Sequence, residues 1–206
     1  MPSLRYLALG DSYTIGEGVD EAARWPLQLA RQLRDGGIDL APPRIVATTG
    51  WTTDELAAAI EDAALPATFD FVTLCIGVND QYRGRDASEY RMRLQPLLET
   101  ATTLAAGRVD RVLMLSIPDW GVTRFARREG RDPAEVAHEI DAFNAIAREL
   151  CEARRIAWVD ITPASRDDGD ADAMLAEDGL HPSGAMYARW VDIVLPVAHR
   201  LLADAA

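Results

Sequence analysis

The sequence contains no lysine, so all 21 of its basic residues are arginines. The absence of lysine excludes a catalytic Schiff-base lysine and the phosphate-binding lysine of P-loop enzymes. The arginines are outnumbered by 33 acidic residues, which gives a formal net charge of −12 at pH 7. A chain with this charge repels polyanions, so neither nucleic acid nor an anionic membrane surface is an expected partner.

Cysteine is also scarce, with Cys75 in an apolar run and Cys151 in a helical pattern. Neither has metal-ligand spacing, so both are expected to be small buried hydrophobic residues, and we expect no metal and no cofactor. No apolar run is long enough to cross a bilayer, and the first residues show no signal-type segment. We therefore expect a cytoplasmic protein. Nothing in the sequence indicates an oligomeric state.

The chain is predicted to form one α/β domain that spans residues 1–206. Its hydrophobic content of 49% is enough for one core at this length. Short apolar runs alternate with helical patterns, which is typical of a three-layer sandwich around a parallel sheet. Five strands in the flavodoxin-like order 2-1-3-4-5 fit this alternation. The strands are predicted at 4–9, 44–48, 69–76, 111–117 and 156–161. The helices are predicted at 25–33, with a stop at 36–37, and at 52–60, 87–106, 133–155 and 183–202. Pro96 predicts a kink or a break in the helix at 87–106. Residues 118–132 are predicted to form a long loop of the kind that often lines a cleft.

A serine follows the first predicted strand directly, in the tripeptide Gly10-Asp11-Ser12. In open α/β sheets, ligands bind at the carboxyl ends of the strands, so Ser12 is a candidate nucleophile. Glycine, aspartate and serine are also ordinary turn residues. The tripeptide alone therefore leaves a catalytic and a structural interpretation open.

A serine nucleophile needs a base, and the chain has only three histidines. His138 and His199 lie within helical patterns, where packing or surface exposure explains them. His181 lies instead in a loop after the fifth predicted strand, and Pro182 holds its backbone extended. Asp178 precedes it across a flexible glycine and can orient the imidazole. We therefore predict that His181 is the base and Asp178 its partner.

Polar loops also follow the second and third predicted strands, at Gly50 and at Gly77-Val78-Asn79-Asp80. On the residues alone, Gly50 also suits a strand end and Asn79 a turn. Together with the serine tripeptide and the Asp178–Pro182 segment, these blocks resemble the SGNH hydrolases, also called the GDSL esterase/lipase family. The four blocks occur in the family's order and the match runs almost from end to end. Tyr13 departs from the name motif, which has leucine.

The resemblance implies that Ser12 attacks an ester carbonyl and forms an acyl-enzyme, while His181 transfers the proton and Asp178 orients His181. It also implies an oxyanion hole made by the backbone N–H groups of Ser12 and Gly50 and by the side-chain amide of Asn79. The residue types fit these roles. Glycine lets a ligand approach the backbone closely, and an amide donates without titrating.

Tyr13, Trp51 and Trp120 are candidate substrate contacts, because aromatic side chains from these segments can ring a cleft at the sheet edge. We interpret Asp11 and Asp80 as structural carboxylates that brace their loops. Further side chains that can ring the cleft are Tyr82, Phe125 and Met174.

The sequence does not define the substrate beyond a small-molecule ester. Arg124, Arg127 and Arg128 either receive an anionic substrate or are solvated. The family that the chain resembles includes esterases, thioesterases, lysophospholipases and carbohydrate deacetylases. We predict short-chain acyl or aryl esters, because the chain has no amphipathic anchor for lipid aggregates.

Two alternatives come from other functional classes. The loop 10–18 resembles a flavin- or phosphate-binding turn, with Ser12 and Thr14 donating to an anion. That interpretation leaves Asp178 and His181 unexplained. The other alternative is a catalytically idle binding protein that keeps these residues behind a blocked cleft.

Overall fold

The computed structural model describes residues 3–203 and contains a five-stranded parallel sheet in the order β2-β1-β3-β4-β5. This order is the predicted one. Residues 1–2 and 204–206 of the predicted domain lie outside the described residues. The strands are β1 (Tyr6–Gly10), β2 (Arg44–Ala47), β3 (Phe71–Cys75), β4 (Val112–Leu115) and β5 (Ala157–Val159).

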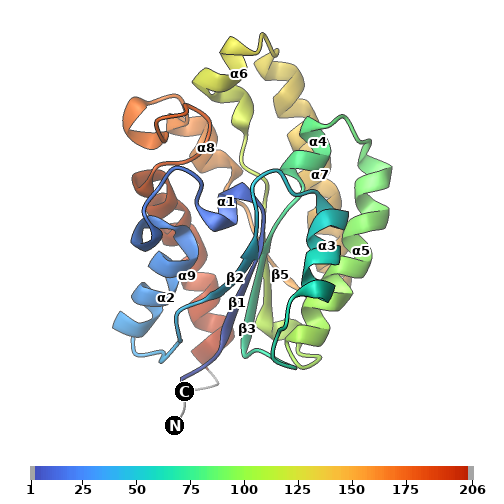
Figure 1. Ribbon diagram of the computed structural model, residues 1–206, viewed down its shortest axis with the longest axis vertical. Coiled ribbons are helices and arrows are strands. Elements are labelled where there is room, and N and C mark those ends of the chain that lie inside the picture. Colours follow the sequence, from blue (N-terminus) through green and yellow to red (C-terminus); the bar gives the residue numbers. More distant parts are fainter. Residues whose placement is uncertain (1–2, 204–206) are drawn as a thin grey trace.

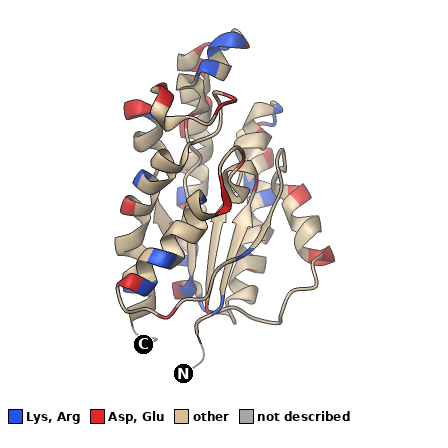
Figure 2. Ribbon diagram, turned by 60° about the vertical axis from the view of Figure 1, so that its left-hand side comes forward, with Lys and Arg blue, Asp and Glu red and all other residues tan. Residues whose placement is uncertain are grey.

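Five longer helices cover the two faces of the sheet, as Figure 1 shows. One face carries α2 (Trp25–Asp35) and α9 (Gly184–Leu202). The other carries α3 (Thr53–Asp62), α5 (Ala87–Leu104) and α7 (Pro133–Arg154). Charged residues lie mainly on the helices and loops, whereas the strands are almost free of them (Figure 2). The result is the expected three-layer sandwich.

Burial differs between the central and the edge strands. Every residue of β1, β3 and β4 is buried, whereas β2 begins exposed and β5 is only partly buried. A central parallel strand is covered by helices on both faces, so an uninterrupted apolar run is needed there. This explains why the three central strands stand out as apolar runs in the sequence.

The helix that follows β2 begins where the sequence predicts. The Glu55 carboxylate accepts a hydrogen bond from the backbone N–H of Thr52 at 2.8 Å, as in a capping box. At the start of α7, Asp132 accepts from the backbone N–H of Ala134 at 2.9 Å. These side chains satisfy backbone donors that have no partner inside the helix.

Short helical segments follow several strands at the carboxyl edge of the sheet (Figure 1). They include α1 (Ser12–Ile15) after β1, α4 (Val78–Tyr82) after β3 and α8 (Thr162–Asp168) after β5. The predicted long loop 118–132 is partly helical, because it contains η3 (Trp120–Val122) and α6 (Arg124–Arg128). The remaining 3-10 turns are η1 (Glu21–Ala23), η2 (Val109–Arg111) and η4 (Asp172–Met174).

Of the predicted kink or break at Pro96, the break is wrong, because α5 continues through this residue. Proline removes one backbone hydrogen bond, to the carbonyl four residues earlier. That carbonyl belongs to Met92, which is 68% exposed, so water can satisfy it. The opposite side of the helix is held by Leu94, Leu97 and Leu98, which are buried. Packing of this face maintains the helix.

Candidate active site

Ser12 is the first residue of α1 and follows β1 after a single residue. That residue, Asp11, caps the helix: its Oδ1 accepts the backbone N–H of Tyr13 at 3.0 Å. Ser12 is only 5% exposed. Within residues 3–203, neither the Ser12 hydroxyl nor its backbone N–H is hydrogen-bonded. The cap thus fixes the backbone of Ser12 and leaves both of its polar groups available.

Asp178 and His181 form a compact hydrogen-bonded unit. Asp178 Oδ2 lies 2.5 Å from His181 Nδ1, and Asp178 Oδ1 accepts the backbone N–H groups of Leu180 and His181 at 2.8 and 3.0 Å. The intervening Gly179 has φ +73°, which permits this tight turn. Burial alone raises the pKa of Asp178, but the hydrogen bond from His181 and the backbone donors outweigh it and lower that pKa. Asp178 is therefore ionised at neutral pH.

The loop that carries this unit is tied to α6. The backbone N–H of Phe125 donates to the carbonyl of Gly179 at 3.0 Å, and Arg128 Nη2 donates to the carbonyl of Asp178 at 2.7 Å. On its other side, the backbone N–H of Ala176 donates to the carbonyl of His181 at 2.7 Å. Contacts on both sides of the loop fix the position of the imidazole.

Gly50 and Asn79 come from the loops after β2 and β3. Gly50 has φ +85°, a conformation that favours glycine, and its N–H donates to no atom of residues 3–203. Asn79 Nδ2 donates to the carbonyl of Trp51 at 2.9 Å, which fixes the plane of the amide. The β1 residue Gly10 pairs with Ala47 of β2 and Cys75 of β3, so the three strands end together. The sheet register therefore brings these loops to the same edge as Ser12.

Asp80 braces the loop that carries Asn79. Its carboxylate accepts the backbone N–H of Thr53 at 3.0 Å and the Thr53 hydroxyl at 2.6 Å, and Arg85 Nη1 lies 2.9 Å from it. Asp80 is fully buried, and burial raises its pKa in spite of these partners. These contacts agree with the interpretation of Asp80 as a structural residue.

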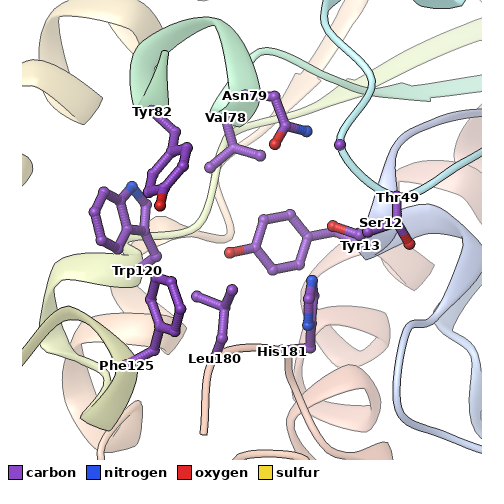
Figure 3. A pocket seen from close by; sticks show the side chains of 11 residues that line it. Ser12, Tyr13, Thr49, Val78, Asn79, Tyr82, Trp120, Phe125, Leu180 and His181 are labelled. Carbon is purple, nitrogen blue, oxygen red and sulfur yellow. The ribbon is translucent and has the colours of Figure 1, made fainter. Parts of the chain in front are cut away.

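A pocket of about 160 Å³ contains both Ser12 and His181 (Figure 3). Most of its wall is apolar, with Tyr82, Trp120 and Phe125 gathered on the side opposite Ser12. The three rings contact one another, with centroids 5.3 to 6.5 Å apart. We call this the catalytic pocket; its full lining is Ser12, Tyr13, Thr49, Gly50, Val78, Asn79, Tyr82, Trp120, Phe125, Leu180 and His181.

A comparison with known families agrees with this arrangement. The profile of the GDSL-like lipase/acylhydrolase family matches residues 8–189. The chain belongs to this family. It is therefore an acylhydrolase of the GDSL type, and the matched range includes the serine tripeptide, Gly50, Asn79 and the Asp178–His181 unit. No curated protein sequence matches the chain.

Several solved structures share the fold. TesA superimposes with a TM-score of 0.73 at 23% identity, covering 96% of this chain and 99% of TesA. The lipase/acylhydrolase from Enterococcus faecalis gives a TM-score of 0.73 at 19% identity, covering 96% of each chain. Axe2-W215I, an acetyl xylan esterase from Geobacillus stearothermophilus, gives 0.72 at 21% identity, covering 96% of each chain.

Of the three predicted substrate contacts in this GDSL hydrolase, two line the pocket and one does not. Tyr13 and Trp120 line the catalytic pocket, but Trp51 does not; its carbonyl accepts the hydrogen bond from Asn79 Nδ2. Thr49, Val78 and Leu180 also line the pocket and were not predicted to do so, although each is adjacent in sequence to a motif residue. His138 and His199 are exposed and lie outside the pocket.

Arg124, Arg127 and Arg128 do not line the catalytic pocket. Arg124 Nη1 lies 2.5 Å from Asp172, Arg127 donates to the carbonyl of Val122 at 3.2 Å, and Arg128 binds the carbonyl of Asp178. The chain itself thus occupies at least one donor of each guanidinium. This favours a structural role for them over binding of an anionic substrate.

Within residues 3–203, no three His, Cys, Asp or Glu side chains are grouped so that they could hold a metal ion. None of the helices in that range is both long and apolar enough to span a bilayer.

Proposed function

We propose that this GDSL hydrolase cleaves carboxylic esters of short acyl or aryl groups, with Ser12 as nucleophile and His181 as general base. The observation that supports this most strongly is the shared pocket. One wall of it carries the Ser12 hydroxyl and an imidazole that a carboxylate holds at 2.5 Å. A serine with a carboxylate-oriented histidine is the arrangement that acyl transfer requires.

The reaction uses the two nitrogens of the imidazole differently. Ionised Asp178 accepts a hydrogen bond from Nδ1–H of His181, which leaves Nε2 as the proton acceptor. Ser12 Oγ forms a bond to the ester carbonyl carbon, and its proton passes to Nε2. When the bond to the leaving oxygen breaks, Nε2 returns the proton to that oxygen and an alcohol departs. Water then attacks the acyl-serine by the same proton route and releases the carboxylic acid.

The negative oxygen of the tetrahedral intermediate needs hydrogen-bond donors already in position. The free N–H groups of Ser12 and Gly50 and the amide of Asn79 lie around the catalytic pocket and supply three of them. Trp51 holds the Asn79 amide through one N–H, so the second N–H remains for the oxyanion. Loss of one such donor typically lowers turnover by about 100- to 1,000-fold.

The size of the pocket supports a small substrate. A closed apolar cavity of roughly 150 Å³ is large enough to hold benzene, and the catalytic pocket has about 160 Å³. A short acyl chain or a single aromatic ring therefore fits, and the surrounding rings offer edge-to-face contacts. Long acyl chains and lysophospholipids exceed this space.

Hydrolysis of p-nitrophenyl acetate by matched variants tests the proposal. We expect Ser12→Ala and His181→Ala each to lower kcat/KM by at least about 1,000-fold. His138→Ala is the control, because His138 is exposed on α7 and outside the pocket. Full activity of Ser12→Ala, or an equal loss in His138→Ala, contradicts the proposal.

A substrate panel separates the alternatives with the same site. Rates over short esters, thioesters, acetylated sugars and lysophospholipids are expected to be highest for the short esters. Absence of turnover and of labelling by a fluorophosphonate favours an idle binding protein. Flavin absorbance in the purified protein favours the cofactor-binding alternative.

A further inference from the structure

A second, smaller cavity lies behind the catalytic pocket. It has a free volume of about 20 Å³, and its wall is mainly apolar. We call it the rear cavity; residues that line it and not the catalytic pocket include Pro118, Val122, Met174, Leu175, Met186 and Trp190. Tyr13, Trp120 and Leu180 line both spaces. These three side chains therefore form the partition between the two.

Tyr13 is the partition residue closest in sequence to the nucleophile. It is 4% exposed, and its ring lies against His181 at 5.7 Å and against Trp190 at 6.0 Å between centroids. Figure 3 shows the ring in the middle of the lining residues, with its hydroxyl directed toward Leu180 and Trp120. The cap on α1 binds the backbone N–H of Tyr13 itself, so the ring keeps a fixed position relative to Ser12.

The hydroxyl of Tyr13 does not fix the ring. It has no hydrogen-bond partner among residues 3–203. Burial raises the pKa of Tyr13 well above its ordinary value of 10, so the group stays neutral. The ring is thus held by packing against His181 and Trp190. Its effect on the pocket is one of shape, and the hydroxyl can be removed without moving it.

We propose that Tyr13 sets the acyl-chain length of this enzyme, because its ring closes the inner end of the catalytic pocket and separates it from the apolar rear cavity. Removal of the ring joins the two spaces and lets longer acyl chains enter. This proposal rests on the function proposed above. The acyl group is the part that occupies the pocket, since it stays bonded to Ser12 in both half-reactions while the alcohol must leave.

The test is the chain-length profile of kcat/KM over p-nitrophenyl acetate, butyrate, hexanoate and octanoate. The wild-type rate is expected to fall beyond butyrate. In Tyr13→Ala, hexanoate gains two buried CH₂ groups at roughly fourfold each, so the hexanoate-to-acetate ratio rises at least about tenfold. Tyr13→Phe keeps the ring and is expected to keep the wild-type profile. Tyr13→Leu provides a smaller truncation, with a shift in the same direction, should the alanine variant fold poorly.

The matched control is Met186→Ala, because Met186 lines the rear cavity but not the catalytic pocket, so the variant enlarges the rear cavity and leaves the partition intact. It is expected to keep the wild-type profile. An unchanged ratio in a folded, acetate-active Tyr13→Ala or Tyr13→Leu overturns the inference, as does a longer-chain preference in Met186→Ala. The inference is also overturned if the Tyr13 variants gain a preference for longer alcohols among alkyl acetates and not for longer acyl chains. Failure of the wild type to hydrolyse any ester instead overturns the proposed function.

Discussion

Replacement of Asp11 by asparagine should stabilise the protein at alkaline pH and change it little in acid. Asp11 is 1% exposed, and Oδ1 is used by the N-cap while Oδ2 is buried without a partner among residues 3–203. Burial, with a smaller contribution from the nearby Asp80 charge, raises the pKa of Asp11 to about 7. Asparagine keeps the oxygen that caps α1 and removes the charge that the site disfavours.

The sign and size of this stability change follow from the linkage between proton binding and folding. Because the folded state holds the proton more tightly than the unfolded state, the stability that Asp11 contributes is fully present below pH 3.8. It is lost as the pH rises to about 7. The rise of the pKa from 3.8 to about 7 corresponds to a loss of about 4 kcal/mol. The free energy of unfolding of Asp11→Asn relative to wild type should therefore increase by up to about 4 kcal/mol between pH 4 and pH 8.

The assay is urea unfolding of both proteins at several pH values, followed by the fluorescence of the five tryptophans. The control is Asp110→Asn, because the hydrogen bond from Arg108 lowers the pKa of Asp110, so its difference from wild type has the opposite pH dependence. Parallel stability curves for wild type and Asp11→Asn across this range would mean that Asp11 is ionised at no cost, contrary to this prediction.

Three further variants test other parts of the structure. Asp178→Asn should lower kcat by about 100-fold or more with little change in Tm, measured by ester hydrolysis and thermal unfolding, since an amide does not stabilise the imidazolium. Gly77→Ala should destabilise the fold by more than about 2 kcal/mol, because φ is +127° and the new Cβ would lie 2.6 Å from an aromatic ring; Gly107→Ala, with φ +77° and open space, should cost less in the same urea assay. Asn144→Ala should cost roughly 2 kcal/mol in that assay, because it leaves the buried N–H of Ile117 unpaired, whereas the carbonyl of Ile117 keeps Thr162 Oγ1 as a partner.

The sheet was predictable because burial on both faces produces an uninterrupted apolar run. This is why the three central strands can be identified from the sequence, whereas their order was predicted from the alternation of strands and helices by analogy with flavodoxin-like sheets. The short helices α1 and α4 were missed, since four or five residues contain too little periodicity to separate a helical turn from a loop. The continuity of α5 at Pro96 depends on which side of the helix faces solvent, and tertiary packing decides that.

The candidate site also has a part that could be predicted from the sequence and a part that could not. Ser12, Gly50 and Asn79 each follow a strand, so a parallel sheet is enough to predict that they share an edge. Which aromatic side chains reach the pocket depends on side-chain direction in loops, and Trp51 shows that proximity in sequence does not determine it. The same holds for Arg124, whose partner Asp172 lies 48 residues away and could not be identified from spacing.

In the proposed reaction, the Ser12 hydroxyl becomes acylated with help from His181. Mass spectrometry of the protein quenched in acid during turnover of p-nitrophenyl acetate detects this acyl group, and peptide fragmentation locates the modified residue. We predict an acetyl group on Ser12 in the wild type and none in His181→Ala quenched at the same time. An acetyl group on another residue, or turnover without any acyl-enzyme under conditions where deacylation is slow, would contradict the claim.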